Sequence, residues 1–508
     1  MIRTVHALSR SPGLRAAAPL SRALSSGKTL DVRSPSTGEL LQTVPSVTAA
    51  GARDAVRAAA AAQSAMAAML PAEREAALLR LAAALEARSE ELALTMAREA
   101  GKPLREARGE VAYSLGFFRW FAGEARRSYG RTIPTTHVDR RLWTIRQPVG
   151  LCALISPWNF PLAMLARKLA PAIAAGCASV MKPAEDTPLT ALILAEEAAR
   201  CGIPPDAASL LVCSRDDVAE VGEVLATDPA VKKLSFTGST AVGKQLASWA
   251  SGTVKRVSLE LGGNAPAVVF RDADIGKAAA AIVASRFRNS GQTCVCTNRV
   301  LVDASVAGQL TDAMAELIDG LVIGDAADER TDVGPLVNER AAASAASFQQ
   351  QALDAGARPV VGGRGRVSAA GGVRRVGDAP TAEFDPDDGT TFFEPVLLVG
   401  ASPGMRCVAE ESFAPILPVT TFDVEAEAVE LANHASAGLA AYAFTRDLGR
   451  ALRMSEALEF GMVGVNEAVI STEVAPFGGI KESGTGREGA AEGIDEYTEV
   501  KYVAVGGV

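Results

Sequence analysis

Short apolar segments alternate with helix-like segments between residues 149 and 236, and this pattern limits the possible folds more than any other feature of the chain. Each apolar segment has strand length, and each segment between them is long enough for a helix. Continuous apolar strands separated by helices are typical of βαβ units, in which a parallel sheet is covered on both faces. A second alternating region, from about residue 265 to 465, predicts a second α/β domain. The candidate strands of the first region are residues 150–155, 179–181, 209–213 and 233–236.

The composition argues against several classes of partner. The formal net charge is −8, which does not suit a nucleic-acid-binding surface. No uninterrupted apolar run approaches the roughly 20 residues that span a membrane. Cys294 and Cys296 have no companion pair of cysteines or histidines at ligand spacing, so we predict no metal site. We therefore expect neither nucleic acid, nor membrane, nor metal as a partner.

Residues 1–28 differ in composition from the rest of the chain. They carry five basic residues, several serines and no acidic residue. This is the composition of an organelle transit peptide, for the mitochondrial matrix first and the plastid second, with a disordered basic tail as the alternative. Its removal would change the formal net charge from −8 to −13, because five positive charges would leave with it. The basic residues are Arg3, Arg10, Arg15, Arg22 and Lys28.

Three glycine-rich segments receive no catalytic role. Residues 238–245 nearly match a P-loop, but Gln245 stands where a Ser or Thr would bind Mg²⁺. Residues 484–489 spell G-x-G-x-x-G without a preceding apolar strand, so we interpret them as a turn. Residues 362–391 are rich in Gly, Arg and Asp and show no apolar period, which predicts a mobile surface loop.

Two strand ends carry residues that suit a dinucleotide. Lys182 and Glu185 follow the strand that ends at Met181, and ligands of open α/β sheets bind at the carboxyl ends of strands. A Lys and a Glu there suit ribose hydroxyls, with solvated surface charges as the alternative. Gly238 and Ser239 form a tight turn before a helix N-terminus, which suits a pyrophosphate, with an ordinary helix cap as the alternative.

Three residues could carry covalent chemistry. Cys294 follows a glycine turn among polar and small residues, and a thiolate attacks an aldehyde carbonyl readily, although such a cysteine alone is more often structural. Glu260 lies in apolar company, where burial would raise its pKa and suit a general base, with a salt-bridged Glu as the alternative. Asn159 lies in a Pro-flanked turn and could donate to an oxyanion, with a rigid structural turn as the alternative.

These residues belong to a set of ordered motifs that resembles the aldehyde dehydrogenase superfamily from about residue 30 to the C-terminus. The resemblance implies an α/β protein with a Rossmann-like cofactor domain (29–132 and 151–262), an α/β catalytic domain (263–476) and a small β oligomerisation arm (133–150 and 477–508), in a dimer or tetramer. The motifs are Pro157-Trp-Asn-Phe-Pro161, Lys182-Pro-Ala-Glu185, Phe236-Thr-Gly-Ser239, Leu259-Glu-Leu-Gly-Gly263, Gly291-Gln-Thr-Cys294, Glu411-Ser-Phe-Ala-Pro415 and Pro476-Phe-Gly-Gly479.

The resemblance also implies roles for individual residues. Cys294 would be the nucleophile, Glu260 the general base and Asn159 the oxyanion donor, helped by the backbone N–H of Cys294. Ala414 stands where the family usually has glycine, and its methyl group could displace the loop that holds Glu411. The residues that would line a nicotinamide dinucleotide are Trp158, Lys182, Glu185, Gly238, Ser239 and Glu411.

Residues 294–296, 461–467 and 476–489 resemble the succinate-semialdehyde dehydrogenase branch of this family. That branch implies NAD-dependent oxidation of succinate semialdehyde to succinate through a cysteine thiohemiacetal and thioester, as in 4-aminobutyrate degradation. Guanidinium forks hold carboxylates well, and the positions that match the branch's carboxylate site are Arg167, Arg288 and Ser471. Another aldehyde, such as glutarate semialdehyde, is the alternative substrate, and a non-catalytic structural or binding protein on the same fold is the alternative from another class.

Two finer expectations concern the cofactor and regulation. Glu185 would repel a 2′-phosphate, and a small neutral residue there accompanies NADP in related enzymes, so NAD is favoured over NADP. Cys296 lies two residues from Cys294 and could close a disulfide with it under oxidation, which would act as a redox switch. The alternative is that Cys296 is a small packed residue.

Overall fold

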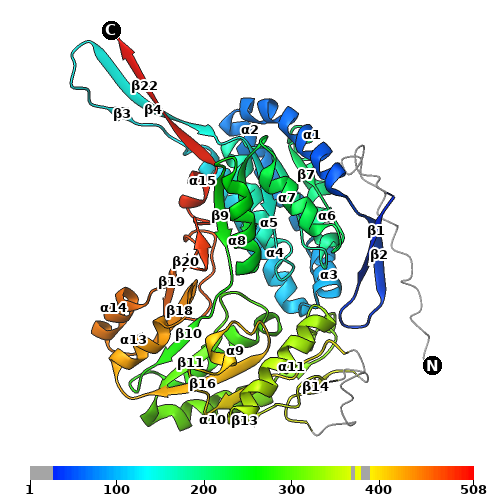
Figure 1. The fold of residues 1–508 in the computed structure, drawn as a ribbon, viewed down its shortest axis with the longest axis vertical. Coiled ribbons are helices and arrows are strands. Elements are labelled where there is room, and N and C mark those ends of the chain that lie inside the picture. Colours follow the sequence, from blue (N-terminus) through cyan, green and yellow to red (C-terminus); the bar gives the residue numbers. More distant parts are fainter. Residues whose placement is uncertain (1–26, 368–371, 379–389) are drawn as a thin grey trace.

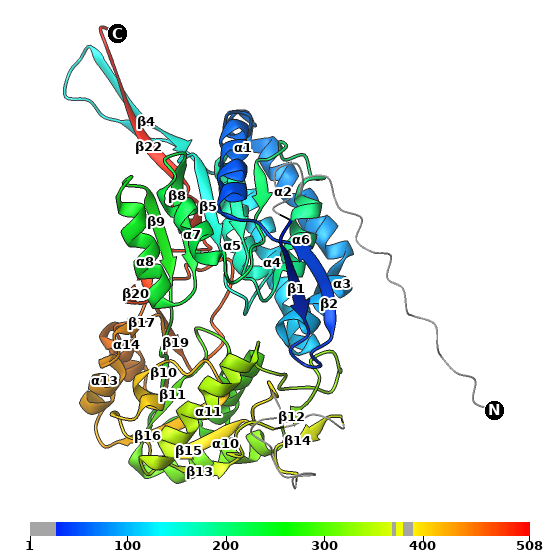
Figure 2. The ribbon, with the colours of Figure 1, turned by 45° about the vertical axis from the view of Figure 1, so that its right-hand side comes forward.

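The computed structural model describes residues 27–367, 372–378 and 390–508, which form one α/β region, a further α/β region and a projecting arm (Figures 1 and 2). The predicted transit peptide lies outside the described residues, apart from Gly27 and Lys28. Among the described helices, none combines the length and the apolar character that crossing a bilayer requires.

The first region is built on a sheet with the strand order β21-β9-β8-β5-β6-β7. Strands β9, β8, β5, β6 and β7 run parallel, and β21 pairs with β9 antiparallel. Because neighbouring strands are parallel, their carboxyl ends lie at one edge of the sheet. The strands are β5 (Leu151–Ile155), β6 (Ser179–Lys182), β7 (Ala208–Leu210), β8 (Val231–Thr237), β9 (Arg256–Glu260) and β21 (Gly484–Thr485).

Helices cover this first sheet, and local signals in the sequence set several of their ends. Pro71 begins α2, where its missing N–H costs no helical hydrogen bond, and Gly101 ends α3 in the left-handed region at φ 70°. The hairpin β1 (Thr29–Arg33) and β2 (Leu40–Pro45) lies beside these helices (Figure 1). The helices are α1 (Ala49–Ala68), α2 (Pro71–Ala87), α3 (Ser89–Ala100), α4 (Leu104–Ala125), α5 (Ala163–Ala175), α6 (Pro188–Ala198), α7 (Val218–Thr227), α8 (Thr240–Ser251) and α15 (Glu492–Asp495).

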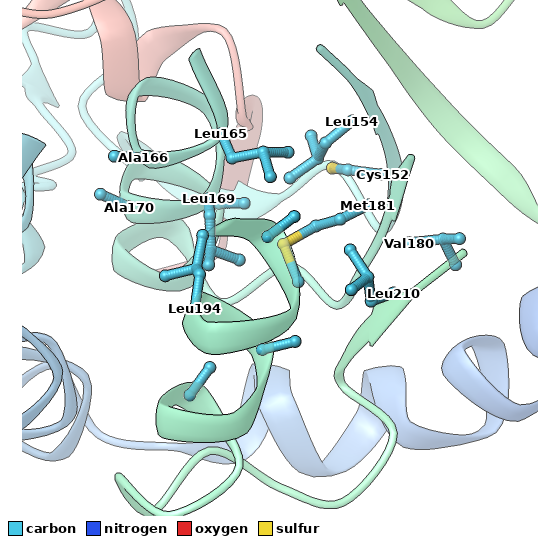
Figure 3. Packing of buried hydrophobic residues seen from close by; sticks show 14 of the residues in the cluster. Cys152, Leu154, Leu165, Ala166, Leu169, Ala170, Val180, Met181, Leu194 and Leu210 are labelled. Atoms are coloured by element: carbon cyan, nitrogen blue, oxygen red, sulfur yellow. The ribbon is translucent and has the colours of Figure 1, made fainter. Parts of the chain in front are cut away.

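The apolar core of this region joins α5 to the sheet. Leu165 and Leu169 on α5 pack toward Leu154 of β5 and Met181 of β6 (Figure 3). All four side chains are completely buried, so the helix and the two strands form one rigid unit. The residues after β5 and β6 are therefore held in a fixed relation to α5.

The second region is built on a sheet with the strand order β13-β15-β16-β11-β10-β18-β19, parallel except for β13 at one edge. Its strands are β10 (Pro266–Val269), β11 (Arg299–Asp303), β13 (Arg358–Val361), β15 (Val396–Val399), β16 (Ile416–Phe422), β18 (Ala440–Phe444) and β19 (Met462–Val465). Its helices are α9 (Ile275–Phe287), α10 (Ala307–Asp319), α11 (Glu339–Asp354), α12 (Arg406–Ala409), α13 (Glu425–Asn433) and α14 (Leu448–Ala457), with 3-10 turns at Arg288–Gly291 and Ala304–Val306.

The arm consists of β3 (Thr132–Ile133), β4 (Arg140–Pro148) and β22 (Thr498–Gly506), and β22 pairs with β4 antiparallel along its whole length. It projects from the body and leaves Val500 and Tyr502 more than half exposed (Figure 2). Residues 477–497, which the sequence analysis groups with the arm, pack on the body instead, where β20 (Ile480–Lys481) pairs with β17 (Ala437–Gly438) and β21 pairs with β9. The division into domains otherwise stays a prediction.

The segment 362–391 is predicted to be a surface loop, and its described part is more ordered than that. Strand β14 (Arg374–Arg375) pairs with β12 (Val322–Ile323), and Val367 and Val376 are buried. Arg364 donates through Nε to the fully buried Glu394 at 2.7 Å. A charged anchor of this kind leaves no apolar period in the sequence, which is why the pattern did not reveal it.

Candidate active site

The first sheet brings most of the predicted motifs to one edge. Strands β6, β5, β8 and β9 are parallel neighbours, and a predicted motif lies at the carboxyl end of each. Glu260 is the last residue of β9 and Lys182 is the last residue of β6, and the other motif residues follow in loops. The residues placed at this edge are Trp158 and Asn159 after β5, Lys182 and Glu185 at and after the end of β6, Gly238 and Ser239 after β8, and Glu260.

A strained turn presents Cys294 from the second region. The turn contains three consecutive residues at positive φ, a backbone conformation that residues other than glycine rarely adopt: Asn289 (50°), Ser290 (57°) and Gly291 (79°). Side-chain hydrogen bonds hold the turn: Asn289 Nδ2 donates to the Asn159 carbonyl at 3.1 Å, and Ser290 Oγ to the Gly334 carbonyl at 2.9 Å. Strain of this kind, of order 1–3 kcal/mol for each non-glycine residue, clusters at functional sites.

Direct contacts join this turn to the edge of the first sheet. Asn159 Nδ2 donates to the Gln292 carbonyl at 3.0 Å, two residues before Cys294. The Gly263 N–H donates to Glu411 Oε1 at 3.1 Å, and a Cβ at Gly263 would collide with the Cys294 carbonyl oxygen. The structure therefore brings Asn159, Cys294 and Glu411 together, as the motifs predict.

Glu260 is an unpaired buried carboxyl group. Its side chain is 3% exposed, and neither carboxyl oxygen has a hydrogen-bond partner among the described residues. Burial first, and then the nearby Glu488 carboxylate, raise its pKa well above the ordinary value, against the opposing charges of Arg167 and Lys168. A carboxyl group in this state exchanges its proton nearer to neutral pH, which is the property that a general base needs.

The Cys294 thiol is half-buried and neutral in this state. Burial, then the Glu411 carboxylate, and more weakly Glu260 and Cys296, raise its pKa to about 12, while Arg167 opposes the shift. Burial likewise raises the pKa of Glu411 to about 8, against the Gly263 hydrogen bond. The thiol proton must therefore be removed before the sulfur can act as a nucleophile.

An ion-pair network that the sequence analysis missed lies behind Glu260. Arg167 Nε donates to Glu488 Oε2 at 2.6 Å, and Lys168 Nζ donates both to Glu488 and to Thr237 Oγ1, the latter at 2.6 Å. All three charged side chains are buried. Burial opposes ionisation of Glu488, but Arg167 and Lys168 outweigh it and hold the pKa at about 2. One edge of the Arg167 guanidinium is thus already paired with the protein.

Two signals could have suggested this network. Glu488 lies inside the G-x-G-x-x-G segment that we interpreted as a turn, and it is the acidic residue of that motif on the body of the protein. Arg167 and Lys168 are adjacent charges within α5, which is otherwise apolar and completely buried. Buried charges are rare unless paired, so an acidic partner was to be expected.

The predicted carboxylate-binding residues are placed in different ways. Arg288 is half-buried, and its guanidinium lies 5.0 Å from the centre of the Phe160 ring. The Glu106 carboxylate accepts from the Asn289 N–H at 2.7 Å, and the Arg288 charge opposes the rise that burial causes in the Glu106 pKa. Ser471 is half-buried, and within the described residues no hydrogen bond joins it to either arginine.

The residues expected at the cofactor lie at the same edge of the sheet. The Trp158 ring meets Phe413 edge-on, with ring centres 5.6 Å apart. Ala414 is buried and does not adopt positive φ, whereas Phe413 does (49°), so the loop accommodates the added methyl group and Glu411 still reaches Gly263.

Cys296 is a buried free thiol that shares a small pocket with Cys294. The completely buried Arg286 donates through Nη1 to the Cys296 sulfur at 3.2 Å. Burial raises the Cys296 pKa, and the Arg286 charge opposes that shift. No group of three or more metal-binding side chains gathers anywhere in the part of the chain that the structure describes.

Known proteins share this architecture. The sequence model of the aldehyde dehydrogenase family matches residues 23–503. The mitochondrial succinate-semialdehyde dehydrogenase of Arabidopsis thaliana is 46% identical over 479 residues, or 94% of this chain and 86% of that protein. The Escherichia coli succinate-semialdehyde dehydrogenase (NADP+) GabD is 44% identical over 480 residues, or 94% and 95% of the two chains. A crystal structure of succinate-semialdehyde dehydrogenase from Burkholderia pseudomallei has a TM-score of 0.89 and 44% identity, and covers 96% of each chain.

Proposed function

The chain belongs to the aldehyde dehydrogenase family and has its α/β fold, and we propose that it oxidises succinate semialdehyde to succinate. The observation that carries the proposal is the grouping of a half-buried thiol with an unpaired buried carboxyl group and two guanidinium groups. The charges of Glu260 and Arg167 both influence the pKa of Cys294, so both groups lie near the thiol. Cys294 and Arg288 both influence the pKa of Tyr442, a buried residue of β18, so Arg288 lies near the same place. The thiol and carboxyl groups suit aldehyde oxidation, and the guanidinium groups suit a distal carboxylate.

The edge of the first sheet fits a nicotinamide dinucleotide, the cofactor class of this family. Ser239 stands before α8 without a side-chain cap, and no acidic residue lies in the first turn, so the helix N-terminus suits a pyrophosphate. A Cβ at Gly238 would collide with the Phe236 ring, so any other residue there would require that ring to move. Lys182 and Glu185 would hold ribose hydroxyls, with Trp158 and Glu411 closer to the reacting centre.

The residues around Cys294 divide the reaction between them. The Cys294 sulfur adds to the aldehyde carbon once its proton is removed, and Glu260 is the acidic group we propose as acceptor. Asn159 Nδ2 has two N–H bonds and uses one for the Gln292 carbonyl, so the other can stabilise the oxyanion beside the Cys294 N–H. When bound, the dinucleotide supplies the hydride acceptor that turns the thiohemiacetal into a thioester. Glu260 passes the thiol proton on to solvent, and in its ionised form it then takes a proton from the water that hydrolyses the thioester.

We expect Arg288→Gln to raise the KM for succinate semialdehyde about 10- to 100-fold, because a hydrogen-bonded charge pair with the substrate carboxylate is lost. The KM for butanal, an uncharged aldehyde with the same number of carbons, should stay within about twofold. Steady-state kinetics with both aldehydes measure the difference. Arg330→Gln is the control, since Arg330 is exposed and pairs with its near neighbour Asp328. Equal changes for the two aldehydes would remove the carboxylate argument, and a panel that includes glutarate semialdehyde tests the alternative substrate.

We propose NAD as the preferred cofactor and expect at least about a tenfold preference over NADP in kcat/KM. The Glu185 side chain is 17% exposed, and its carboxylate would repel a 2′-phosphate, since facing like charges cost several kcal/mol. Arg215 lies 3.9 Å from Glu185 Oε1 and partly offsets this repulsion. Glu185→Gln should therefore reduce the ratio of kcat/KM with NAD to kcat/KM with NADP. Kinetics with both dinucleotides decide, and equal use of NADP by the wild type would contradict the proposal.

Three further proposals concern assembly, location and regulation. We propose that the arm of β3, β4 and β22 joins subunits of a dimer or tetramer, which light scattering of the purified protein tests.

We propose a mitochondrial location, with the plastid second, which imaging of a tagged full-length chain tests. We propose that a disulfide between Cys294 and Cys296 inactivates the enzyme reversibly, and mass spectrometry after mild peroxide treatment tests this. An unmodified pair in protein that peroxide has inactivated would count against the switch.

A further inference from the structure

Tyr113 carries a buried hydroxyl group that the roles described so far leave unused. It lies on α4, and its ring packs edge-on against Phe117 with ring centres 4.9 Å apart. It also packs against the buried cluster of Phe160, Ala163 and Met164. The hydroxyl oxygen is inaccessible and has no hydrogen-bond partner of acceptable geometry among the described residues. A buried donor without an acceptor costs stability, so its presence calls for an explanation.

The groups around this hydroxyl are cations rather than acceptors. Burial raises the Tyr113 pKa, and the charges of Arg167 and Arg288, together with a close polar contact from the Arg167 side chain to the hydroxyl, oppose that shift, so both guanidinium groups lie near the hydroxyl. Guanidinium groups donate hydrogen bonds and cannot accept them. The carboxylate of Glu488 also acts on Tyr113, but its oxygens are paired with Arg167 and Lys168. The hydroxyl proton therefore lacks an acceptor, and the positive charges of Arg167 and Arg288 both lie near the Tyr113 hydroxyl.

Aromatic rings fix the position of these donors. The Arg288 guanidinium lies 5.0 Å from the centre of the Phe160 ring, and the Arg167 guanidinium lies 4.1 Å from that of Phe477. Phe160 directly follows Asn159, the proposed oxyanion donor. The donors are therefore held close to the reacting centre by α4, α5, the loop after β5 and the turn before Cys294.

We propose that the Tyr113 hydroxyl donates a hydrogen bond to the distal carboxylate of the substrate, between the charges of Arg167 and Arg288. The inference rests on the proposed function and adds a residue that determines its specificity. A carboxylate supplies the missing acceptor and balances the two cations. Since Glu488 already holds one edge of Arg167, the hydroxyl supplies a donor that adds to what this arginine can offer. No bond is made or broken at Tyr113, so it acts in binding alone.

The test is Tyr113→Phe, which removes the hydroxyl and keeps the ring. We expect the KM for succinate semialdehyde to rise at least about tenfold, with kcat and the KM for butanal within about twofold of the wild type. Inhibition by succinate, the carboxylate product, should weaken by a similar factor. The melting temperature should stay the same or rise, because the variant no longer buries an unpaired donor. Tyr129→Phe is the control, since Tyr129 is 71% exposed.

The wild type and the variant report on different claims. If the wild type does not favour succinate semialdehyde over butanal, the proposed substrate is wrong, and this inference falls with it. If the wild type does favour it and Tyr113→Phe keeps the full preference, the inference alone is wrong. Equal losses for both aldehydes, or a lower melting temperature with a changed kcat, would show a structural role and overturn it as well.

Discussion

Replacing Cys294 by alanine is expected to lower kcat/KM for every aldehyde substrate by at least about 10⁴-fold, because no covalent intermediate can form without the sulfur. The fold should survive, since the side chain is only half-buried and the turn before it is held by Asn289 and Ser290. The measurement is steady-state formation of the reduced dinucleotide, together with the melting temperature of each protein. The raised pKa of the thiol predicts one further result: inactivation of the wild type by a thiol-alkylating reagent should keep speeding up as pH rises past about 8.5, where an ordinary thiol begins to level off.

The matched control for this substitution is Cys201→Ala. Cys201 is also a free thiol, and it is 3% exposed in the first region, after α6. Its loss should leave kcat/KM within about twofold of the wild type. A Cys294→Ala protein that keeps its fold and more than about one hundredth of the wild-type activity would require another nucleophile and would contradict the mechanism.

The sequence indicates the residues at strand ends because the strands themselves can be recognised. Apolar runs predict β5, β6 and β8, and a residue that follows such a run must lie at the carboxyl edge of a parallel sheet. Lys182, Asn159 and Gly238 are located by this argument alone. Cys294 and Glu411 belong to the second region. From the sequence, only the family resemblance predicts that they lie at the carboxyl edge of the first sheet.

Ion pairs between residues far apart in the sequence cannot be predicted from strand patterns. Arg167 and Glu488 are 321 positions apart, and no periodic pattern connects a helix of the first region with the G-x-G-x-x-G segment near the C-terminus. Arg167 was expected to bind the substrate carboxylate, and the structure shows that Glu488 already holds one edge of it. The same limit applies to Tyr113, whose importance comes from the absence of an acceptor near its hydroxyl, and that is a property of the folded chain alone.

Backbone strain is equally hard to infer from the sequence. Gly291 indicates a turn before Cys294, but Asn289 and Ser290 also adopt positive φ, which serine rarely does. Glu106 on α4 stabilises this backbone by accepting from the Asn289 N–H, 183 positions away. The presentation of the thiol thus depends on tertiary contacts that no local motif records.

Replacing Glu260 by glutamine is expected to lower steady-state turnover about 10²- to 10⁴-fold, the usual contribution of a positioned general base. Burial and the Glu488 carboxylate raise the Glu260 pKa, so the ionised, proton-accepting form of the wild type increases as pH rises through that raised value. Wild-type turnover should therefore rise with pH and then level off, whereas the Gln variant should lack this rise. Glutamine keeps the size of the side chain and replaces one unpaired buried polar group with another, so the melting temperature should change little.

The same variant separates hydrolysis from the earlier steps. If hydrolysis depends on Glu260 more strongly than removal of the thiol proton does, the Gln variant should accumulate the thioester, and mass spectrometry should find the acyl group on Cys294. Glu86→Gln is the control, because Glu86 is exposed and pairs with Arg119 on the protein surface. A variant that turns over at the wild-type rate, or one that keeps the wild-type pH dependence, would assign the base to another group. Loss of turnover without any acyl-enzyme would show that the variant is blocked earlier, at the removal of the proton that the raised pKa of Cys294 holds on the sulfur, which is the other role proposed for Glu260.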